Sequence, residues 1–209
     1  TPNDRTLVYA QWSEGFRLGK GQGLPPESCD TFENDTGAIL TSKVEADTTE
    51  NIELGAKLSL LDNRLKMNTA IFQTNWTNLP VTISDGVSCF IVNNIGEARI
   101  QGVEFESSYA LTSELLIDFS ASYMDTEWTD AFAPITTGES LVYVPKTNVS
   151  VGLQYDFDLG SFPTFVRTDV AYVGEYEAGA RHSALPTVDG YSRINLRAGL
   201  SVDQWSIDI

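Results

Sequence analysis

Alternation of apolar and polar residues is the main pattern of this chain, and it is clearest over residues 51–76. In the first half of this stretch every second residue is apolar, namely Ile52, Leu54, Ala56, Leu58 and Leu60. A period of two is that of a β-strand with one apolar and one polar face, whereas a helix would spread these residues around its axis. Residues 61–64 (Leu-Asp-Asn-Arg) include types that tolerate a tight turn. The stretch therefore predicts a hairpin of two long strands.

The same alternation recurs along the chain and predicts about nine strands in total. Outside the hairpin, the expected strands lie within residues 5–16, 91–110, 115–123, 149–157, 166–172, 194–200 and 205–209. Strands that follow one another with no helix between them favour an all-β, antiparallel up-and-down meander.

The expected strand over residues 91–110 changes its facing along its length. Glu97, Arg99 and Gln101 would share the face of the apolar Val103. Two explanations remain open. Either a β-bulge near Gly96 or Gly102 restores the register, or this half of the strand projects beyond a membrane.

The connections between the expected strands alternate between long and short. Long loops are expected at residues 17–44, 77–90, 129–144 and 177–189, and short turns at 61–64, 111–113, 158–163 and 202–204. All the short connections would then lie at one end of the sheet. Bacterial outer-membrane barrels have this arrangement, with short periplasmic turns and long extracellular loops.

The polar face of the expected sheet carries charged residues along whole strands, which suits a wet lumen. Tyrosines and tryptophans near strand ends would form interfacial girdles: Tyr9, Trp12, Trp76, Tyr109, Tyr123, Trp128, Tyr155, Tyr172 and Trp205. The alternative is a soluble meander in which one face is solvated and the aromatic residues cap a core. Loop alternation and strand length favour the transmembrane barrel.

Composition changes this interpretation little. The chain has 209 residues and a formal net charge of −16, which argues against binding to nucleic acid. No apolar run is long enough for a membrane helix, and no signal peptide precedes the first strand. Because single-chain bacterial barrels have an even number of strands, the odd count leads us to expect a fragment of a larger barrel, cut at both ends.

Several segments together resemble the C-terminal part of the β-barrel of TonB-dependent outer-membrane receptors. They are YAQWSEGFR (9–17), TENIELGAKLSLLDNRLKMNTAIFQTNW (49–76), NNIGEARIQGVEFE (93–106), VPKTNVSVGLQYDF (144–157) and YSRINLRAGL (191–200). The resemblance spans nearly the whole chain, so residues 1–209 would form one partial barrel domain. It implies a barrel of about twenty-two strands, a plug domain inside the lumen, and a periplasmic motif that contacts TonB. The plug, the motif and the last strand, which ends in an aromatic residue, are not found in these residues.

Candidate catalytic and metal sites are weak. Pro25 and Pro26 preclude the helix that a phosphate-binding glycine loop at residues 19–23 would need. The acidic loop Asp30–Asp35 departs from an EF-hand but could form an irregular calcium site. The single histidine, His182, has no partner for a triad or a histidine metal site. We therefore expect no enzyme, no metal site and no cofactor.

The two cysteines lie in consecutive long loops that are both expected on the extracellular side. Because the periplasm is oxidising and the loops flank one hairpin, we expect a Cys29–Cys89 disulfide. Unpaired thiols, or partners outside this chain, remain the alternatives.

Charged residues on the polar strand face are candidates for contact with a substrate or with the plug. They are Glu53, Lys57, Lys66, Glu104, Glu106, Asp118, Arg167, Asp169, Arg193 and Arg197. Most should pair with one another or with plug residues. Arg17, where the first strand meets its loop, is the best single candidate to bind an anionic ligand.

The resemblance implies a multi-pass receptor of the bacterial outer membrane that takes up a scarce nutrient. Ferric siderophores, cobalamin, haem and oligosaccharides are all substrates of the family. The expected partners are TonB, the plug domain, membrane lipid and a small-molecule ligand, with no nucleic acid. A passive porin, a small anchor barrel or a soluble β-sheet binding module would be the alternatives.

Overall fold

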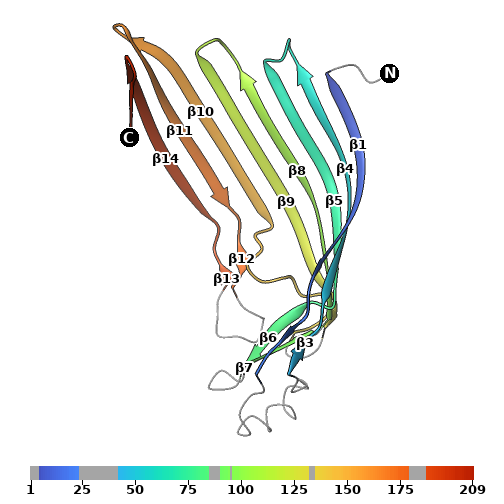
Figure 1. Cartoon of the computed structure of the whole chain (residues 1–209). Helices are drawn as coiled ribbons and strands as arrows, with labels where there is room; N and C mark the ends of the chain where they lie inside the picture. The colour runs from blue at the N-terminus through green and yellow to red at the C-terminus, as the bar shows by residue number, and fades with distance from the viewer. Residues whose placement is uncertain (1–4, 24–41, 85–89, 95, 132–134, 179–186) are drawn as a thin grey trace.

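The computed structural model describes residues 5–23, 42–84, 90–94, 96–131, 135–178 and 187–209. Its main element is a nine-stranded antiparallel sheet in the order β1-β4-β5-β8-β9-β10-β11-β14-β15 (Figure 1). The strands of this sheet are β1 (Thr6–Arg17), β4 (Asp47–Leu60), β5 (Leu65–Thr77), β8 (Gly96–Ala110), β9 (Leu115–Ala131), β10 (Thr147–Leu159), β11 (Phe162–Val173), β14 (Tyr191–Val202) and β15 (Trp205–Asp208). The predicted all-β meander of about nine strands is confirmed.

The predicted hairpin is formed by β4 and β5, which pair from Leu60 and Leu65 at the turn to Thr48 and Thr77 at the far end. The turn places Leu61, Asp62 and Asn63 at φ values of 51°, 54° and 68°. Asp and Asn adopt this left-handed region more readily than other non-glycine residues. The Asp and Asn residues from which the turn was predicted therefore adopt the backbone conformation that closes the hairpin.

Short turns lie at one end of the sheet and long connections at the other (Figure 1). The long connections are more ordered than the sequence predicts, because they contain three two-stranded sheets. The strands of these sheets are β2 (Lys20–Gly21), β3 (Lys43–Val44), β6 (Pro80–Ser84), β7 (Phe90–Asn94), β12 (Tyr176–Glu177) and β13 (Thr187–Val188). Apart from β7, these short strands lie in or beside segments expected to be loops, and we call this end of the sheet the loop end.

The strand expected over residues 91–110 is two strands. β7 pairs with β6 in a small sheet, whereas β8 belongs to the main sheet. A register shift does occur between Glu97 and Ala98, near one of the expected bulge positions. It does not restore the facing, however, because the β5–β8 register runs without a shift from Ala98 to Tyr109.

The change of facing is not confined to β8, because the two faces of the whole sheet exchange polarity at the loop end; projection of this part beyond a membrane stays a prediction. Pairing aligns Leu54, Ile71, Val103 and Tyr123 in one apolar row across four strands of the outer face. Four residues nearer the loop end along each strand, the row on the same face reads Glu50, Asn75, Arg99 and Glu127. Strand β8 therefore continues past the edge of the apolar belt.

On the opposite face, the same region of the loop end is apolar. A buried cluster is formed there by Leu79, Ala98, Trp128 and Leu141. Thr126 is buried beside this cluster and accepts a hydrogen bond from the backbone N–H of Leu141 (3.0 Å). The cluster fastens the connections on either side of β8 and β9 to the inner face of the sheet.

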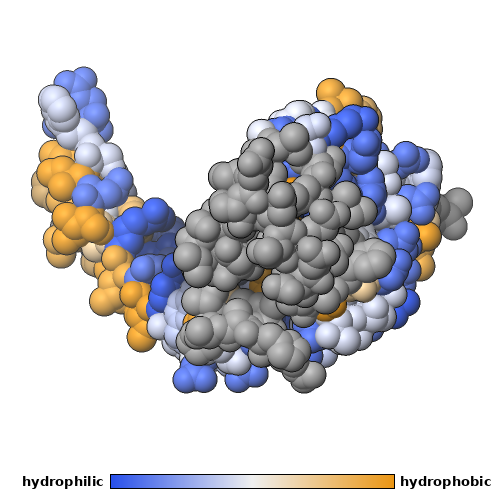
Figure 2. Space-filling model, turned by 90° about the horizontal axis from the view of Figure 1, so that it is seen from below, coloured by the Kyte–Doolittle hydropathy of each residue, from blue (hydrophilic) through white to orange (hydrophobic). Residues whose placement is uncertain are grey.

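Away from the loop end, the outer face of the sheet is apolar and uncovered. The exposed fractions reach 73% for Val8, 69% for Ile194 and 78% for Leu196. Figure 2 shows the sheet as a crescent whose left arm carries hydrophobic residues on its outer side and hydrophilic residues on its concave side. An exposed apolar face of this extent requires an apolar environment or a partner. Among the described residues, no helix is long and apolar enough to cross a membrane.

Three of the aromatic residues expected in interfacial girdles face the other way. The register places Tyr9, Trp76 and Trp128 on the concave face, because they pair with or lie beside concave residues. Trp128 is part of the buried cluster, and Trp76 packs against it. The prediction was wrong for these residues because it used only their position near a strand end and not their parity.

Tyr9 is seated over a glycine of the neighbouring strand. Gly55 lies directly opposite Tyr9, and a Cβ at Gly55 would be 2.3 Å from Tyr9 Cζ. In this position the Tyr9 hydroxyl donates a hydrogen bond to Glu53 Oε1 (2.6 Å). The glycine thus lets the ring lie flat on the sheet and bring its hydroxyl to the carboxylate.

Replacement of Gly55 by Ala is expected to destabilise the full-length protein by about 1–3 kcal/mol, since the new methyl group would displace the Tyr9 ring. The measurement is the thermal unfolding midpoint. Gly21→Ala is the matched control, because the added Cβ would meet only Ser42 O at an ordinary 3.9 Å. Equal stability of the two variants would show that the Tyr9 seat contributes nothing.

Candidate functional site

All the charged residues predicted to face a lumen lie on the concave face of the sheet. The pairing registers place the following side chains on it: Glu53, Lys57, Lys66, Glu104, Glu106, Asp118, Arg167, Asp169, Arg193 and Arg197. Their contact with a substrate or a plug stays a prediction. What the structure adds is which of them pair and which do not.

Arg167 on β11 holds two carboxylates on the concave face. Its Nη1 donates to Asp118 Oδ2 on β9 (2.9 Å), and its Nη2 donates to Asp169 Oδ1 (2.7 Å). The Nε also contacts both Asp169 oxygens at 3.0 Å. Only 17% of the Arg167 side chain is exposed. We call this arrangement the arginine clasp.

The arginine clasp depends on a glycine in the strand that it crosses. Gly152 on β10 lies between β9 and β11, opposite Asp118 and Asp169. A Cβ at Gly152 would be 2.4 Å from Arg167 Nη2 and 2.8 Å from Asp169 Oδ1. The missing side chain lets the guanidinium cross β10 close to the backbone and tie three strands together.

Arg193 and Arg197 on β14 contact aromatic rings instead of carboxylates. The Arg193 Cζ lies 5.9 Å from the Tyr191 ring centroid, and the Arg197 Cζ lies 5.6 Å from that of Phe165. Lys57 similarly lies 6.0 Å from the Tyr9 ring centroid. Such contacts orient a cation but leave its charge uncompensated.

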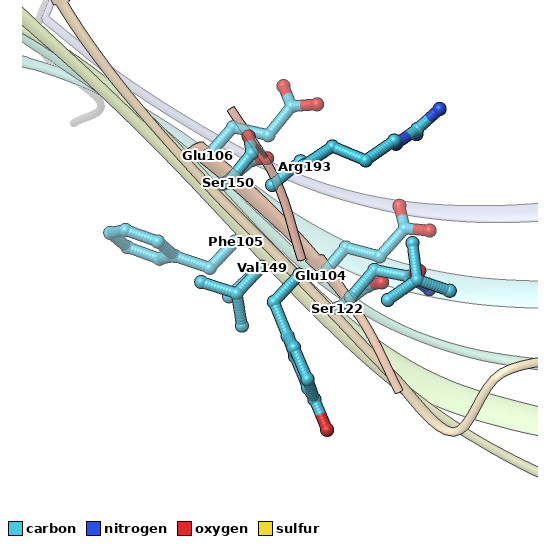
Figure 3. Close-up of a pocket in the computed structure, with 13 residues that line it drawn as sticks. Glu104, Phe105, Glu106, Ser122, Val149, Ser150 and Arg193 are labelled. Atoms are coloured by element: carbon cyan, nitrogen blue, oxygen red, sulfur yellow. Dashed lines mark hydrogen bonds between the residues drawn. The ribbon is translucent and has the colours of Figure 1, made fainter. Parts of the chain in front are cut away.

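A shallow depression of about 320 Å³ lies on the concave face between β8 and β14. Figure 3 shows Glu104, Glu106 and Arg193 projecting to one side of the sheet, whereas Phe105 and Val149 project to the other. The floor between the charged side chains is formed by hydroxyl and amide side chains, namely Ser120, Ser122, Asn148 and Ser150. The depression therefore carries charged side chains at both ends, and Ala171 also contributes to its lining.

At the loop end, Arg17 is engaged by a residue that the sequence reasoning missed. Its Nε and Nη2 donate to Asp47 Oδ2 at 2.9 and 2.7 Å, and its guanidinium lies 5.0 Å from the Trp76 ring centroid. Trp76 Nε1 also donates to Asp47 Oδ2 (2.6 Å). Asp47 is 4% exposed. An ionic role for Asp47 could have been found only from its position opposite Arg17 in the β1–β4 register.

Two opposing effects act on the ionisation of Asp47. Burial disfavours the charged carboxylate, but the hydrogen bonds from Arg17 and Trp76 outweigh it and lower the pKa of Asp47 below its ordinary value. Asp47 is therefore ionised at neutral pH and anchors both donors. The proposed role of Arg17 as an anion-binding residue at the rim stays a prediction.

Other candidate residues lie outside the described ranges. These are Cys29, Cys89, His182 and the acidic loop Asp30–Asp35. In the part of the chain that the structure describes, no group of three or more His, Cys, Asp or Glu side chains is arranged to hold a metal ion.

Comparisons with known proteins agree on one family. The family model described as "TonB dependent receptor-like, beta-barrel" matches residues 1–209. The metal-pseudopaline receptor CntO of Pseudomonas aeruginosa is 30% identical over 187 residues, which cover 86% of this chain and 26% of that protein. The probable TonB-dependent siderophore receptor PiuA of Acinetobacter baumannii is 29% identical over 176 residues, covering 73% of this chain and 23% of that protein. The chain thus spans about a quarter of the length of these relatives.

A solved structure shows the same fold. The ferric yersiniabactin uptake receptor FyuA of Yersinia pestis superposes with a TM-score of 0.74 at 18% identity, over 94% of this chain and 28% of that chain. The match shows that the fold of this chain, including its nine-stranded sheet, is also found in a part of that protein.

Replacement of Arg17 by Met is expected to loosen the loop end of β1 and β4 at neutral pH, because it leaves the buried Asp47 carboxylate without its cation. We expect local opening to become easier by about 1–3 kcal/mol, measured by hydrogen exchange of the backbone amides in residues 15–17 and 47–49.

The effect of Arg17→Met should depend on pH. Because the folded pKa of Asp47 is lowered, its stabilisation is present above the ordinary carboxyl pKa of about 4 and is lost as the pH falls through the folded value. The variant and the wild-type protein should therefore converge in acid. Arg64→Met, in the β4–β5 turn, is the control, and a difference that does not change with pH would contradict an ionic role.

Proposed function

The chain belongs to the TonB-dependent receptor β-barrel family, and from this premise we propose that it forms part of the wall of a receptor for active uptake of a metal chelate such as a ferric siderophore. Like its family, it is a protein of the bacterial outer membrane. The nine strands are part of the barrel, and a plug domain and a TonB-contacting segment belong to the remainder of the full-length receptor.

The observation that carries this proposal is the division of the sheet into two unlike faces. The outer face presents uncovered apolar side chains such as Val8, Ile194 and Leu196, as contact with lipid requires. The concave face carries fixed charges, among them the arginine clasp of Arg167. A wall of this kind separates lipid from an aqueous lumen.

The substrate class is proposed from the relatives. The curated relatives are named as a metal-pseudopaline receptor and as a probable TonB-dependent siderophore receptor, and the solved structure with the same fold is named as a ferric yersiniabactin uptake receptor. A metal chelate is small, polar and scarce, so it needs both a hydrophilic passage and an energy source. In this proposal energy comes through TonB, and the chain itself performs no catalysis.

Deletion of the gene in its own bacterium tests the proposal. We expect uptake of radiolabelled iron from at least one siderophore to fall to the background level and to return when the gene is restored. The same loss should follow when the tonB gene is disrupted or when an uncoupler collapses the proton gradient, since transport is active.

Two other outcomes would contradict the proposal. Uptake that depends on the gene but survives both the tonB disruption and the uncoupler would indicate a passive porin. Unchanged uptake across a panel of ferric siderophores, haem, cobalamin and oligosaccharides would indicate an anchor barrel or a binding module.

A further inference from the structure

One part of the concave face carries charged side chains that form no ion pair with any residue that the structure describes. Glu104 and Glu106 lie on β8, and Arg193 lies on β14. Across the ranges that the structure describes, none of these three side chains takes part in an ion pair, whereas Arg167 close by binds two carboxylates. The three residues line the same depression.

The positions of the strands explain why these charges do not neutralise one another. β9, β10 and β11 lie between β8 and β14, so the two strands are roughly 19 Å apart along the sheet at about 4.8 Å per strand. All three side chains project to the same side of the sheet (Figure 3) and line one depression. A negative end and a positive end thus face one depression without touching.

The floor of the depression supplies neutral hydrogen-bonding groups. Ser120 and Ser150 are hydrogen-bonded to each other at 2.8 Å, and Ser122 and Asn148 line the same space. Hydroxyl and amide groups can both donate and accept, so they suit a ligand with amide or hydroxyl groups in its middle.

We propose that this depression binds an elongated zwitterion, with a cationic group at Glu104 and Glu106 and a carboxylate at Arg193. The proposal rests on the uptake function and specifies the charge pattern of the ligand that passes along this wall. Glu104, Glu106 and Arg193 together are called the bipolar site.

The charge pattern favours a zwitterion over a ligand of one sign. A simple anion at Arg193 would leave the two glutamates uncompensated, and a simple cation would leave Arg193 uncompensated. Glu104, Glu106 and Arg193 are all exposed to solvent, and only a ligand that carries both signs of charge engages both ends of the depression at once. The guanidinium of Arg193 rests against the Tyr191 ring, which orients its planar N–H edge, and this edge matches a carboxylate in two hydrogen bonds.

The test uses the full-length receptor purified in detergent and triglycine as the probe, measured by calorimetric titration. Triglycine has an ammonium group at one end, a carboxylate at the other and amides between them. N-acetyl-triglycine lacks the cation, and triglycine amide lacks the anion. We expect each of the two blocked peptides to bind about tenfold more weakly than triglycine.

The variants assign each charge to its residue. Arg193→Gln should weaken triglycine about tenfold and leave triglycine amide unchanged, whereas Arg193→Lys should retain most of the affinity. Glu104→Gln should weaken triglycine and leave N-acetyl-triglycine unchanged. Its effect should exceed that of Glu106→Gln, because Lys66 lines a neighbouring depression with Glu106. Glu50→Gln, on the outer face, is the matched control.

Three results would overturn the proposal. They are the absence of triglycine binding to the wild-type receptor, equal binding of the three peptides, and unchanged affinity in both Arg193→Gln and Glu104→Gln. If Arg193→Gln instead lowers the unfolding temperature of a receptor that does not bind triglycine, Arg193 is occupied by a carboxylate of the receptor itself. Energy-dependent uptake of a chelate is measured separately, so the two proposals can fail independently.

Discussion

The requirement that every polar backbone group be paired governs this structure, because lipid offers no hydrogen bonds to an open N–H or C=O group. Long antiparallel strands with an almost unbroken register meet this requirement between neighbouring strands of the sheet. Once the backbone is committed to this ladder, each side chain has only two directions available. Apolar residues such as Leu54 and Ile71 lie on the outer face, and charged residues such as Glu53 lie on the concave face.

On the concave face, large polar side chains are held in place by packing over glycines and by contacts with carboxylates. Tyr9 and Arg167 are both large side chains laid flat across a neighbouring strand, and each lies over a glycine, Gly55 or Gly152. The clasp of Arg167 satisfies two aspartates within the wall. The residues of the proposed bipolar site differ because they are exposed and form no ion pair among the described residues, whereas Arg167 holds neighbouring strands together.

The strands, the turns and the division of residues between two faces could be predicted from the sequence. The alternation of apolar and polar residues can be recognised within one strand, without knowing which strands pair with it. The exchange of polarity at the loop end could not be assigned, because Arg99 and Gln101 have the same parity whether a bulge intervenes or the membrane ends. Asp47 was missed because its role exists only once β1 and β4 are aligned. The prediction that Trp76 and Trp128 belong to an interfacial girdle was wrong, because aromatic residues near strand ends can lie on the outer face in a girdle or on the inner face in a core.

The exchange of polarity between the faces also fixes the depth of the protein. Above the row that contains Val103, the outer side becomes polar, and the inner side acquires the cluster around Trp128. A shift of the sheet along the membrane normal by one row would place Gln101 in hydrocarbon or Val103 in water. The edge of the apolar belt therefore opposes such a shift. An insertion or deletion of two residues within a strand would shift the edge of its apolar belt, and one of a single residue would exchange its apolar and polar faces. Changes of length are therefore expected only in the loops.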